Sequence, residues 1–307
     1  MTEIVILDAE SLRTADLEPL ERIGNVRSYP KSTPAEVVTR LRGAQVAITN
    51  KVRIEQHSLA EANKLQAVVA AATGTDHIDR AACEARGIRV GNVVGYATES
   101  VAQYTLSAVL NLRMQLATRD NFCKSGAYTR SARWSSPVPV WKELSGERWG
   151  IVGLGSIGSR VAELAHCFGC EPVFFSSSGR RGDARYPQLG LEELLKTSDI
   201  VSVHAPGEPR YHKLLDEGML KLMQPTATLI VAGRGAIVDE AVTAYMLDAG
   251  LLAGAAFDVF EEEPFGFEHP FLSLSHPERL LLTPHMAWTS TQALANLVQG
   301  LVEQLQR

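Results

Sequence analysis

The segment GIVGLGSIG constrains what this chain can fold into more than any other part of the sequence. A short apolar run leads into three glycines with the spacing G-x-G-x-x-G. Gly153 permits a tight turn, Gly155 leaves room for a pyrophosphate near the backbone, and Gly158 lets a following helix pack close to the strand. The first helical residues, Ser156 and Ile157, offer N–H groups and a partial positive charge to phosphates. We interpret the segment as the phosphate-binding turn of a dinucleotide site, although glycine turns also occur for structural reasons alone.

The residues on both sides of this turn support that interpretation. Residues 148–152 (RWGIV) form a short apolar run that is typical of a buried strand. The helix expected after the turn carries its apolar residues on one face, namely Val161, Leu164, Ala165 and Phe168. A strand, a glycine turn and an amphipathic helix therefore follow one another in the order that a dinucleotide-binding unit requires.

Length and composition set the class of protein. The 307 residues exceed one typical core and predict two domains. Hydrophobic residues make up 45% of the chain and charged residues 21%, as in an ordinary globular protein. The formal net charge is -5 and we find no basic stripe, so we expect no nucleic acid partner. The sequence has no apolar run as long as a membrane span and begins without a signal-peptide pattern. We therefore expect no membrane partner and a cytoplasmic location.

The cysteines include one pair with the spacing of a metal or redox motif. The four cysteines are Cys83, Cys123, Cys167 and Cys170. The spacing of Cys167 and Cys170 is C-x-x-C, but no second pair exists to complete a zinc site. We expect the pair to pack at a helix end as reduced thiols and to bind no metal, which agrees with a cytoplasmic setting.

The order of the expected elements predicts an α/β fold with two doubly wound domains. In the first third of the chain, strands at residues 4–7, 44–49, 65–71 and 88–92 alternate with helices at residues 34–41, 57–62 and 78–85. Such alternation is typical of parallel strands with helical crossovers. A second alternating series begins with the strand before the glycine turn and continues to a strand at residues 280–283 and a helix at residues 291–305.

Two segments between these series do not fit the alternation. Residues 98–116 predict one long apolar helix that either crosses between domains or packs against a partner subunit. Residues 125–145 hold Gly126, Pro137, Pro139 and several serines, and they predict an exposed connection or arm. We expect one domain to comprise residues 1–97, completed by residues 287–307, and the other to comprise residues 98–286.

The residues after the second strand of the nucleotide unit favour one coenzyme. In dinucleotide folds this strand usually ends in Asp or Glu, which binds the adenosine ribose. Here no carboxylate occurs before Asp183, and the candidate ligands are hydroxyl or guanidinium groups: Ser176, Ser177, Ser178, Arg180 and Arg181. These groups would bind the 2′-phosphate of NADP, so we expect a preference for NADP(H), with NAD(H) possible. The alternative is that the two arginines are solvated loop charges.

Three later segments carry candidate reacting groups. Arg234 lies between two glycines at the expected end of a strand, where open α/β sheets bind ligands. Its guanidinium suits a substrate carboxylate. Asp258 and Glu263 lie in the segment DVFEEEP after the next strand, and His285 follows Pro284 after a further strand. Each is ordinary by itself, since single charges and histidines usually have no catalytic role.

Taken together, these motifs resemble the D-isomer-specific 2-hydroxyacid dehydrogenases over nearly the whole chain. The matching elements are the glycine turn, the Gly-Arg-Gly segment, Asp-Val-Phe-x-x-Glu-Pro and Pro-His-x-Ala-Trp. Two upstream matches are ATGTDHID at residues 72–79 and NVVGYATESVAQ at residues 92–103. The Pro-His-x-Ala-Trp form is most similar to the glycerate dehydrogenase and hydroxypyruvate or glyoxylate reductase branch.

The resemblance implies a role for each reacting group. His285 would be the general acid for reduction and the base for oxidation, and Glu263 would hydrogen-bond it and favour its protonated form. Arg234 would bind the substrate carboxylate and stabilise charge developing on the keto oxygen. Backbone N–H groups of Thr73 and Gly74 would hold the carboxylate from the other domain.

The resemblance also implies further contacts. Asp258 would face the nicotinamide end of the cofactor. Other residues expected near the cofactor are Thr105, His204, Ala205, Ala232, Gly233, Arg234, His285 and Ala287. Trp288 and the arm around residues 133–134 are candidates for shaping the substrate pocket. Two departures weaken the match: Ala232-Gly233 replaces the usual Asn or Thr-Ala before the arginine, and the loop after His204 lacks the usual Leu-Thr pair.

The implied protein reduces a small 2-keto acid, glyoxylate- or hydroxypyruvate-like, to the D-2-hydroxy acid with NAD(P)H. The implied fold pairs a flavodoxin-like substrate domain with a Rossmann dinucleotide-binding domain. The active site would lie between them, with hinge closure and a homodimer formed through the helix at Thr98 and the arm after Ser125. Two alternatives stay open. A formate dehydrogenase would pair the histidine with Gln, which Glu263 argues against, and a nucleotide-sensing corepressor would show feeble turnover.

Overall fold

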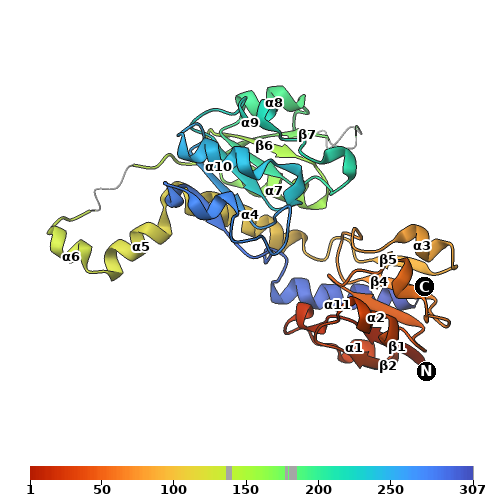
Figure 1. The fold of residues 1–307 in the computed structure, drawn as a ribbon. Helices are drawn as coiled ribbons and strands as arrows, with labels where there is room; N and C mark the ends of the chain where they lie inside the picture. The colour runs from red at the N-terminus through yellow and green to blue at the C-terminus, as the bar shows by residue number, and fades with distance from the viewer. Residues whose placement is uncertain (136–139, 177–178, 180–184, 307) are drawn as a thin grey trace. The chain divides into compact units, whose positions relative to one another are not determined.

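The structure, a computed structural model, describes residues 1–135, 140–176, 179 and 185–306. It divides into two compact units, each built around its own parallel sheet (Figure 1). Unit 1 combines Met1–Ala97 with Trp288–Arg307, and unit 2 is the continuous stretch Thr98–Ala287. The prediction of a doubly wound α/β fold is confirmed, since in each unit the strands are parallel and alternate with helices.

Unit 1 contains five parallel strands in the order β2-β1-β3-β4-β5. The strands are β1 (Thr2–Ile6), β2 (Gly24–Ser28), β3 (Val46–Thr49), β4 (Ala67–Ala70) and β5 (Arg89–Asn92). The helices are α1 (Glu18–Glu21), α2 (Pro34–Arg40), α3 (Arg80–Glu84) and α11 (Thr291–Leu305). This is the flavodoxin-like strand order, in which the chain reverses direction across the sheet between β1 and β3.

Local sequence signals explain where the helices of unit 1 begin. Thr33 precedes α2 and forms a capping box with Glu36, while Pro34 occupies the first helical position. Asp79 accepts a hydrogen bond from the backbone N–H of Ala82 at the start of α3 (2.9 Å). Polar side chains thus satisfy backbone groups that a helix end would leave unpaired.

The late helix α11 completes the core of unit 1. One apolar face of α11 packs with Ile4, Ile6, Ile48 and Val69 from the sheet, and its buried residues are Ala293, Leu294, Leu297, Val298, Leu301 and Val302. The helix also lies close to the segment after β5, because a Cβ atom at Gly300 would fall 2.3 Å from Val93 Cγ1. Residues 288–307 therefore belong to the same core as residues 1–97.

Unit 2 contains six parallel strands in the order β11-β10-β9-β8-β6-β7. The strands are β6 (Arg148–Val152), β7 (Glu171–Phe175), β8 (Ile200–Val203), β9 (Thr228–Val231), β10 (Gly254–Phe257) and β11 (Leu280–Leu282). The helices are α4 (Thr98–Met114), α5 (Leu116–Lys124), α6 (Ala127–Ser131), α7 (Ser156–Cys167), α8 (Leu191–Thr197), α9 (Glu217–Leu220) and α10 (Glu240–Asp248). The strand order reverses between β6 and β8, so ligands are expected beyond the carboxyl ends of these two strands.

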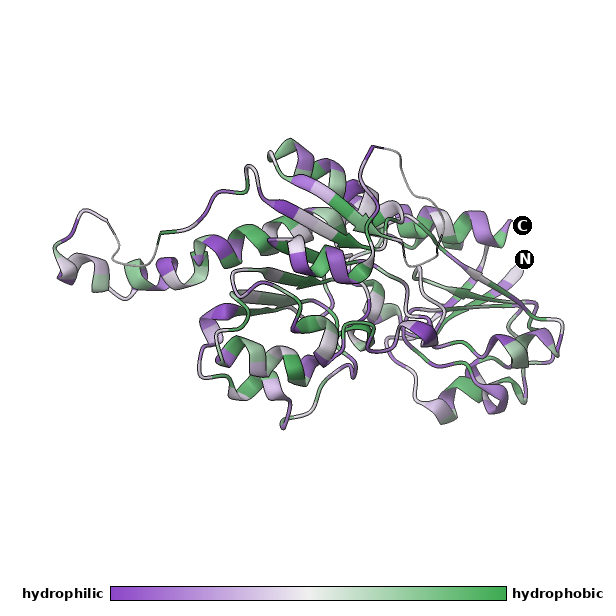
Figure 2. Cartoon of the chain, turned by 90° about the horizontal axis from the view of Figure 1, so that it is seen from above, coloured by the Kyte–Doolittle hydropathy of each residue, from purple (hydrophilic) through white to green (hydrophobic). Residues whose placement is uncertain are grey.

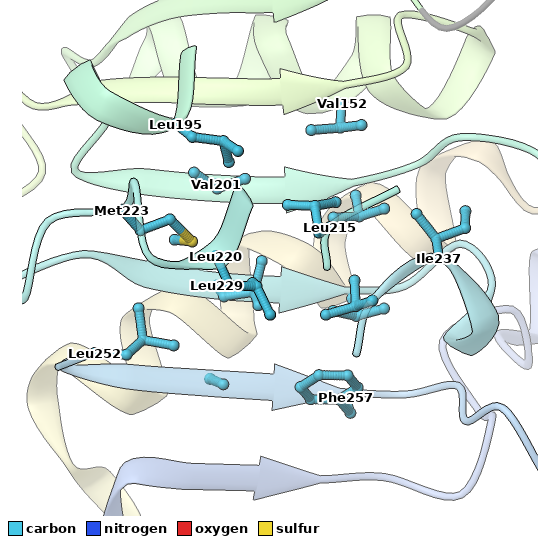
Figure 3. Close-up of a cluster of buried hydrophobic side chains, with 14 of the residues drawn as sticks. Val152, Leu195, Val201, Leu215, Leu220, Met223, Leu229, Ile237, Leu252 and Phe257 are labelled. Atoms are coloured by element: carbon cyan, nitrogen blue, oxygen red, sulfur yellow. The ribbon is translucent and has the colours of Figure 1, made fainter. Parts of the chain in front are cut away.

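Both faces of this sheet are buried by helices. On one face, Figure 3 shows strand residues meeting residues of the helical layer, among them Val152, Val201, Leu229 and Phe257 with Leu195 and Leu220. On the other face, α4 and α7 bury Ala102, Val109, Val161 and Ala165 against Ile151. The hydropathy colours in Figure 2 agree with this burial: the strands are predominantly hydrophobic, whereas the helices carry both hydrophobic and hydrophilic residues.

The expected long helix at residues 98–116 is wrong in one respect. Gln115 adopts a left-handed conformation (φ 49°), which ends α4 at Met114 and starts the separate helix α5. The short helix α6 then lies inside the stretch predicted to be a connection. Neither α5 nor α6 has a buried residue, and both extend away from the sheet of unit 2 (Figures 1 and 2). Of the predicted arm at residues 125–145, the described part is exposed or half-buried except for Leu144, which is buried, and it contains the helix α6.

The structure differs from the sequence analysis at three further places. Strand β2 was not predicted, because GNVRS lacks an apolar run and pairs with β1 at one edge of the sheet. The helix expected at residues 57–62 is a short 3₁₀ helix at Gln56–Leu59. Phe168, expected on the buried face of α7, is 45% exposed because it lies beyond the last turn of that helix.

Candidate active site

The glycine turn between β6 and α7 has the geometry that its spacing predicts. Gly153 has a φ of 97°, a backbone conformation that residues other than glycine rarely adopt. A Cβ atom on Gly158 would lie 2.1 Å from the carbonyl oxygen of Gly153, so α7 approaches the turn too closely for any side chain there. Gly155 has nothing within 4 Å of an added Cβ atom. The turn thus has two glycines required by packing and one that faces open space.

Open space at Gly155 fits a bound pyrophosphate. Gly155 is the N-cap of α7 and provides no side-chain cap for the first turn of that helix. These backbone N–H groups carry the positive end of the helix dipole. Ser156 and Ile157 lie in this first turn. The residues of this chain therefore fit a dinucleotide phosphate at the point where the strand order reverses.

His204 lies directly after β8, on the other side of the same reversal. Its backbone N–H donates to the carbonyl of Val152 (2.8 Å). Although part of the residue is exposed, both ring nitrogens are covered and have no hydrogen-bond partner in the described part of the chain. Burial lowers the pKa of His204 to about 4, so its imidazole is neutral near pH 7. A covered, unpartnered imidazole beside the glycine turn is a group that a ligand would satisfy.

The candidate acid–base pair is formed in unit 2 by two loops that follow neighbouring strands. His285 Nδ1 lies 2.6 Å from Glu263 Oε2, and Glu263 Oε1 accepts a hydrogen bond from the backbone N–H of Phe260 (3.0 Å). The side chains of His285 and Glu263 are 24% and 29% exposed. The carboxylate is thus oriented by its own loop and directed at one ring nitrogen of an accessible histidine.

The backbone of His285 is strained and is held in place by Asp258. His285 has a φ of 49°, in the left-handed region that is unfavourable for most side chains. Both oxygens of Asp258 bind the next two residues, Oδ1 accepting from the N–H of Met286 and Oδ2 from that of Ala287 (2.9 Å each). These bonds fix the peptide that follows His285.

A chain of hydroxyl groups reaches the same carboxylate. Thr283 Oγ1 donates to Asp258 Oδ1 (2.6 Å) and lies 2.8 Å from the hydroxyl of Tyr104, on α4. Because Thr283 uses its proton on Asp258, Tyr104 donates to Thr283. Asp258 is 1% exposed, and burial raises the pKa of this carboxyl. Burial also raises the pKa of Tyr104, which therefore stays protonated as a donor.

Arg234 lies just beyond the carboxyl end of β9, which pairs with β10 on the side away from β11. It follows β9, is partly buried, and directs Nη1 to the carbonyl of Gly233 (3.0 Å). Its glycine neighbours are required by close packing: a Cβ atom on Gly235 would lie 2.0 Å from the backbone of Phe260. A Cβ atom on Gly207 would lie 2.8 Å from the Arg234 side chain. The arginine and the Glu263 loop are therefore packed together through Gly235.

Comparison with known proteins agrees with this geometry. Residues 106–287 match the model of the D-isomer specific 2-hydroxyacid dehydrogenase, NAD binding domain. The chain is 32% identical to a glycerate dehydrogenase from Methylorubrum extorquens over 99% of this chain and 95% of that protein. It is 35% identical to a glyoxylate reductase from Aeropyrum pernix over 94% of this chain and 88% of that protein.

The chain belongs to the D-isomer-specific 2-hydroxyacid dehydrogenase family. A solved structure of the TT0316 protein from Thermus thermophilus has the same fold, with a TM-score of 0.85 and 30% identity over 99% of this chain and 96% of that one. The family membership that the motifs predicted is thus confirmed. It makes the protein an oxidoreductase with a nicotinamide dinucleotide cofactor.

Within this dehydrogenase, most of the remaining predicted cofactor residues lie in unit 2. Ala205 is buried beside Gly153 of the glycine turn, and Ala232 is buried directly after β9. Thr105 is fully buried and donates to the carbonyl of Val101 within α4 (2.8 Å). Ser176 follows β7. Ser177, Ser178, Arg180 and Arg181, on which the NADP(H) prediction depends, lie outside the described residues.

The predicted substrate residues Thr73, Gly74 and Trp288 belong to unit 1. Thr73 Oγ1 donates to the carbonyl of Val93 (3.2 Å), and its own carbonyl accepts from the side chain of Asn92 (2.6 Å). The ring of Trp288 meets that of Tyr96 edge to face, with centroids 6.1 Å apart. These contacts order the loop after β4 and the tryptophan within unit 1.

The dehydrogenase also contains groups near the site that the motifs did not reveal. Tyr104 and Thr283 support Asp258, and Thr283 begins the Thr-Pro-His run that had drawn attention only to its histidine. The C-x-x-C pair is divided: Cys167 is exposed, whereas Cys170 is buried with its thiol directed at the carbonyl of Leu144 (3.3 Å). In the described part of the chain, no cluster of three metal-ligating side chains and no membrane-spanning helix is found.

Proposed function

We propose that this dehydrogenase reduces a small 2-keto acid to the D-2-hydroxy acid, with His285 as proton donor and Arg234 as carboxylate ligand. The observation that carries the proposal is the 2.6 Å contact between His285 Nδ1 and Glu263. Half-buried Arg234 lies beside Gly235, which packs against the loop that carries Glu263. An imidazole held by a carboxylate at one ring nitrogen is suited to general acid–base catalysis, because its other nitrogen is oriented for proton transfer.

In the proposed reaction, each residue of the site has a separate role. The bound nicotinamide supplies the hydride. Glu263 engages Nδ1 of His285 and thereby sets the ring orientation, so we assign proton transfer to Nε2. Arg234 binds the substrate carboxylate through two parallel hydrogen bonds and stabilises negative charge on the keto oxygen. Asp258 keeps the strained His285 backbone in place.

For the substrate we propose a glyoxylate- or hydroxypyruvate-like acid. The names of the relatives, glycerate dehydrogenase and glyoxylate reductase, support this choice. For the coenzyme we propose a preference for NADP(H), supported by the absence of an acidic residue between Phe175 and Asp183. Serine and arginine side chains in that stretch suit the 2′-phosphate.

One assay tests both proposals. Purified protein is mixed with NADPH or NADH and with glyoxylate, hydroxypyruvate, pyruvate or phenylpyruvate, and nicotinamide absorbance is followed. We expect rapid oxidation of NADPH with glyoxylate or hydroxypyruvate. Faster turnover with NADH would keep the reductase and remove the phosphate-site proposal. Tight nucleotide binding without turnover of any keto acid would favour a nucleotide-sensing protein instead.

We also propose that the protein forms a homodimer through its arm. The nine-residue helix α5 and the short helix α6 have no buried residue. Helices of this length are marginal in water unless a face is packed. Leu116 and Tyr128 are 46% and 40% exposed on them, and a second copy would cover such side chains. Light scattering should give the mass of two chains, and a monomeric mass would refute the proposal.

A further inference from the structure

A second carboxylate lies beneath the Glu263 loop. Glu240 is the first residue of α10, and its side chain is only 9% exposed. Its Oε1 accepts from the backbone N–H of Glu261 (2.9 Å), and its Oε2 lies 2.9 Å from His269 Nε2. Burying a carboxylate is unfavourable unless hydrogen bonds compensate for the lost water. Here one of those bonds goes to the middle of the loop that carries Glu263.

The other partner of Glu240 is fixed by its own surroundings. His269 Nδ1 accepts from the backbone N–H of Phe271 (3.4 Å), so the proton lies on Nε2 and is donated to Glu240. The ring of His269 packs against those of Phe265 and Phe271, with centroids 4.5 and 5.0 Å apart. Glu240 therefore bonds to a rigid imidazole on one side and to the loop on the other.

The loop connects Glu240 to the acid–base pair over a short path. Glu261 N–H binds Glu240, the preceding residue Phe260 donates its N–H to Glu263 Oε1, and Glu263 Oε2 contacts His285. The same backbone lies against Gly235, next to Arg234. A shift of Glu261 would therefore move Phe260, the donor that orients the Glu263 carboxylate.

We propose that Glu240 and His269 are positioning residues that hold the Glu263 carboxylate against His285. The inference rests on the proposed function for its catalytic consequence, while the geometry of the Glu263–His285 contact is independent of it. Neither residue is placed against the reacting atoms. They act on the chemistry by setting the position of one loop, and a misplacement of about 1 Å at a catalytic group lowers rates by up to about a hundredfold.

The chain offers controls for the alternative that Glu240 only stabilises its helix. Asp239 caps the same helix by accepting from the N–H of Val242 (3.1 Å), and it pairs with Lys213. Asp239→Ala should therefore weaken α10 without releasing Glu261. Glu262 is an exposed glutamate on the loop itself, so Glu262→Ala removes a like charge without removing the Glu240 bond.

The experiment compares these controls with Glu240→Ala, Glu240→Gln and His269→Gln. A glutamine at 240 keeps an oxygen for the Glu261 N–H and loses the charged acceptor for His269, so it should lie between the wild type and Glu240→Ala. We expect Glu240→Ala to lower kcat by about tenfold to a hundredfold with little change in KM for the nucleotide. His269→Gln, which leaves the loop bond in place, should lower kcat less.

A spectroscopic readout needs no turnover. A proton shared between His285 Nδ1 and Glu263 gives a far-downfield proton NMR resonance, which is assigned by its loss in Glu263→Gln. We expect this resonance in the wild type and both control variants, a weaker one in Glu240→Gln and none in Glu240→Ala. Retention of the resonance in Glu240→Ala, or an equal loss of kcat in Asp239→Ala, would overturn the positioning role. Absence of turnover in the wild type would instead count against the proposed function, and the resonance would still decide this inference.

Discussion

At the scale of single residues, the candidate site depends on pairs that chain order does not reveal. His285 and Glu263 were predicted from motifs that resemble a family, and the structure adds their 2.6 Å contact. Tyr104, Glu240 and His269 were not predicted, because each is an ordinary residue in its own segment. Their importance arises from contacts with residues that are distant in sequence, such as the Tyr104–Thr283 bond. These residues can be identified only from the hydrogen bonds that their polar groups form in the folded chain.

The first prediction concerns the proposed proton donor. His285→Ala should lower kcat by about a hundredfold to ten-thousandfold, the usual contribution of general acid–base catalysis, while leaving nucleotide affinity nearly unchanged. Steady-state kinetics and a nucleotide fluorescence titration measure the two quantities. His276→Ala is the control, since that ring pairs with Glu278 away from the Glu263 contact. Full turnover by His285→Ala would refute the assignment.

The second prediction concerns the pH dependence of stability. His204 titrates near pH 4 in the fold and near 6.5 when unfolded, so below pH 6.5 the unfolded state binds a proton that the folded state does not. Its contribution to stability is complete above pH 6.5 and is lost as the pH falls to about 4, by at most about 3 kcal/mol. Urea unfolding of the nucleotide-free protein should show a shallower loss for His204→Gln over this range. Equal slopes would contradict the prediction.

At the scale of elements, apolar periodicity was enough where an element is buried. Most strands of the two sheets and the helices α2, α7, α10 and α11 were found because each carries an apolar run or stripe. Edge strand β2 carries no such run. The end of α4 at Gln115 could not be read, because its left-handed backbone is a local conformation without a sequence marker such as glycine. Apolar periodicity reflects burial, so it does not predict elements that are exposed.

The third prediction separates packing from ligand binding in the glycine turn. Gly158→Ala places a methyl group against the Gly153 carbonyl and should destabilise unit 2 by about 1–3 kcal/mol. Gly155→Ala meets no atom within 4 Å and should change stability by less than about 0.5 kcal/mol. It should nevertheless weaken nucleotide binding by roughly tenfold or more, because the methyl group occupies the pyrophosphate space. Unfolding curves and binding titrations compare the two variants, and unchanged affinity in Gly155→Ala would exclude this site.

At the scale of the whole molecule, the chain returns at its end to the unit in which it started. Residues 288–307 supply α11, whose Leu297 and Leu301 are fully buried with Ile4 and Ile48. The family resemblance, more than periodicity, made this return predictable, because the apolar face of a helix does not indicate which sheet the helix packs against. The match to a known family likewise supplied the roles of residues whose chemistry is ambiguous alone.

The fourth prediction tests this arrangement. Leu301→Ala should destabilise unit 1 by about 2–5 kcal/mol, since it removes a fully buried side chain. Hydrogen exchange read by mass spectrometry should show faster exchange in peptides from residues 1–97, with little change in peptides from residues 148–257. Tyr245→Ala is a control, because that side chain is 61% exposed on α10. Equal acceleration in both units would show that they unfold as one.

The divided composition of unit 1 has a consequence during translation. The ribosome makes residues 98–287 before residues 288–307, so unit 2 has all of its strands while unit 1 still lacks α11. Domains commonly fold as they emerge, and partly folded ones expose apolar surface. The face of the first sheet that carries Ile4, Ile48 and Val69 is then covered only by early residues such as Leu12 and Leu20, and part of its apolar surface stays exposed until α11 has been made.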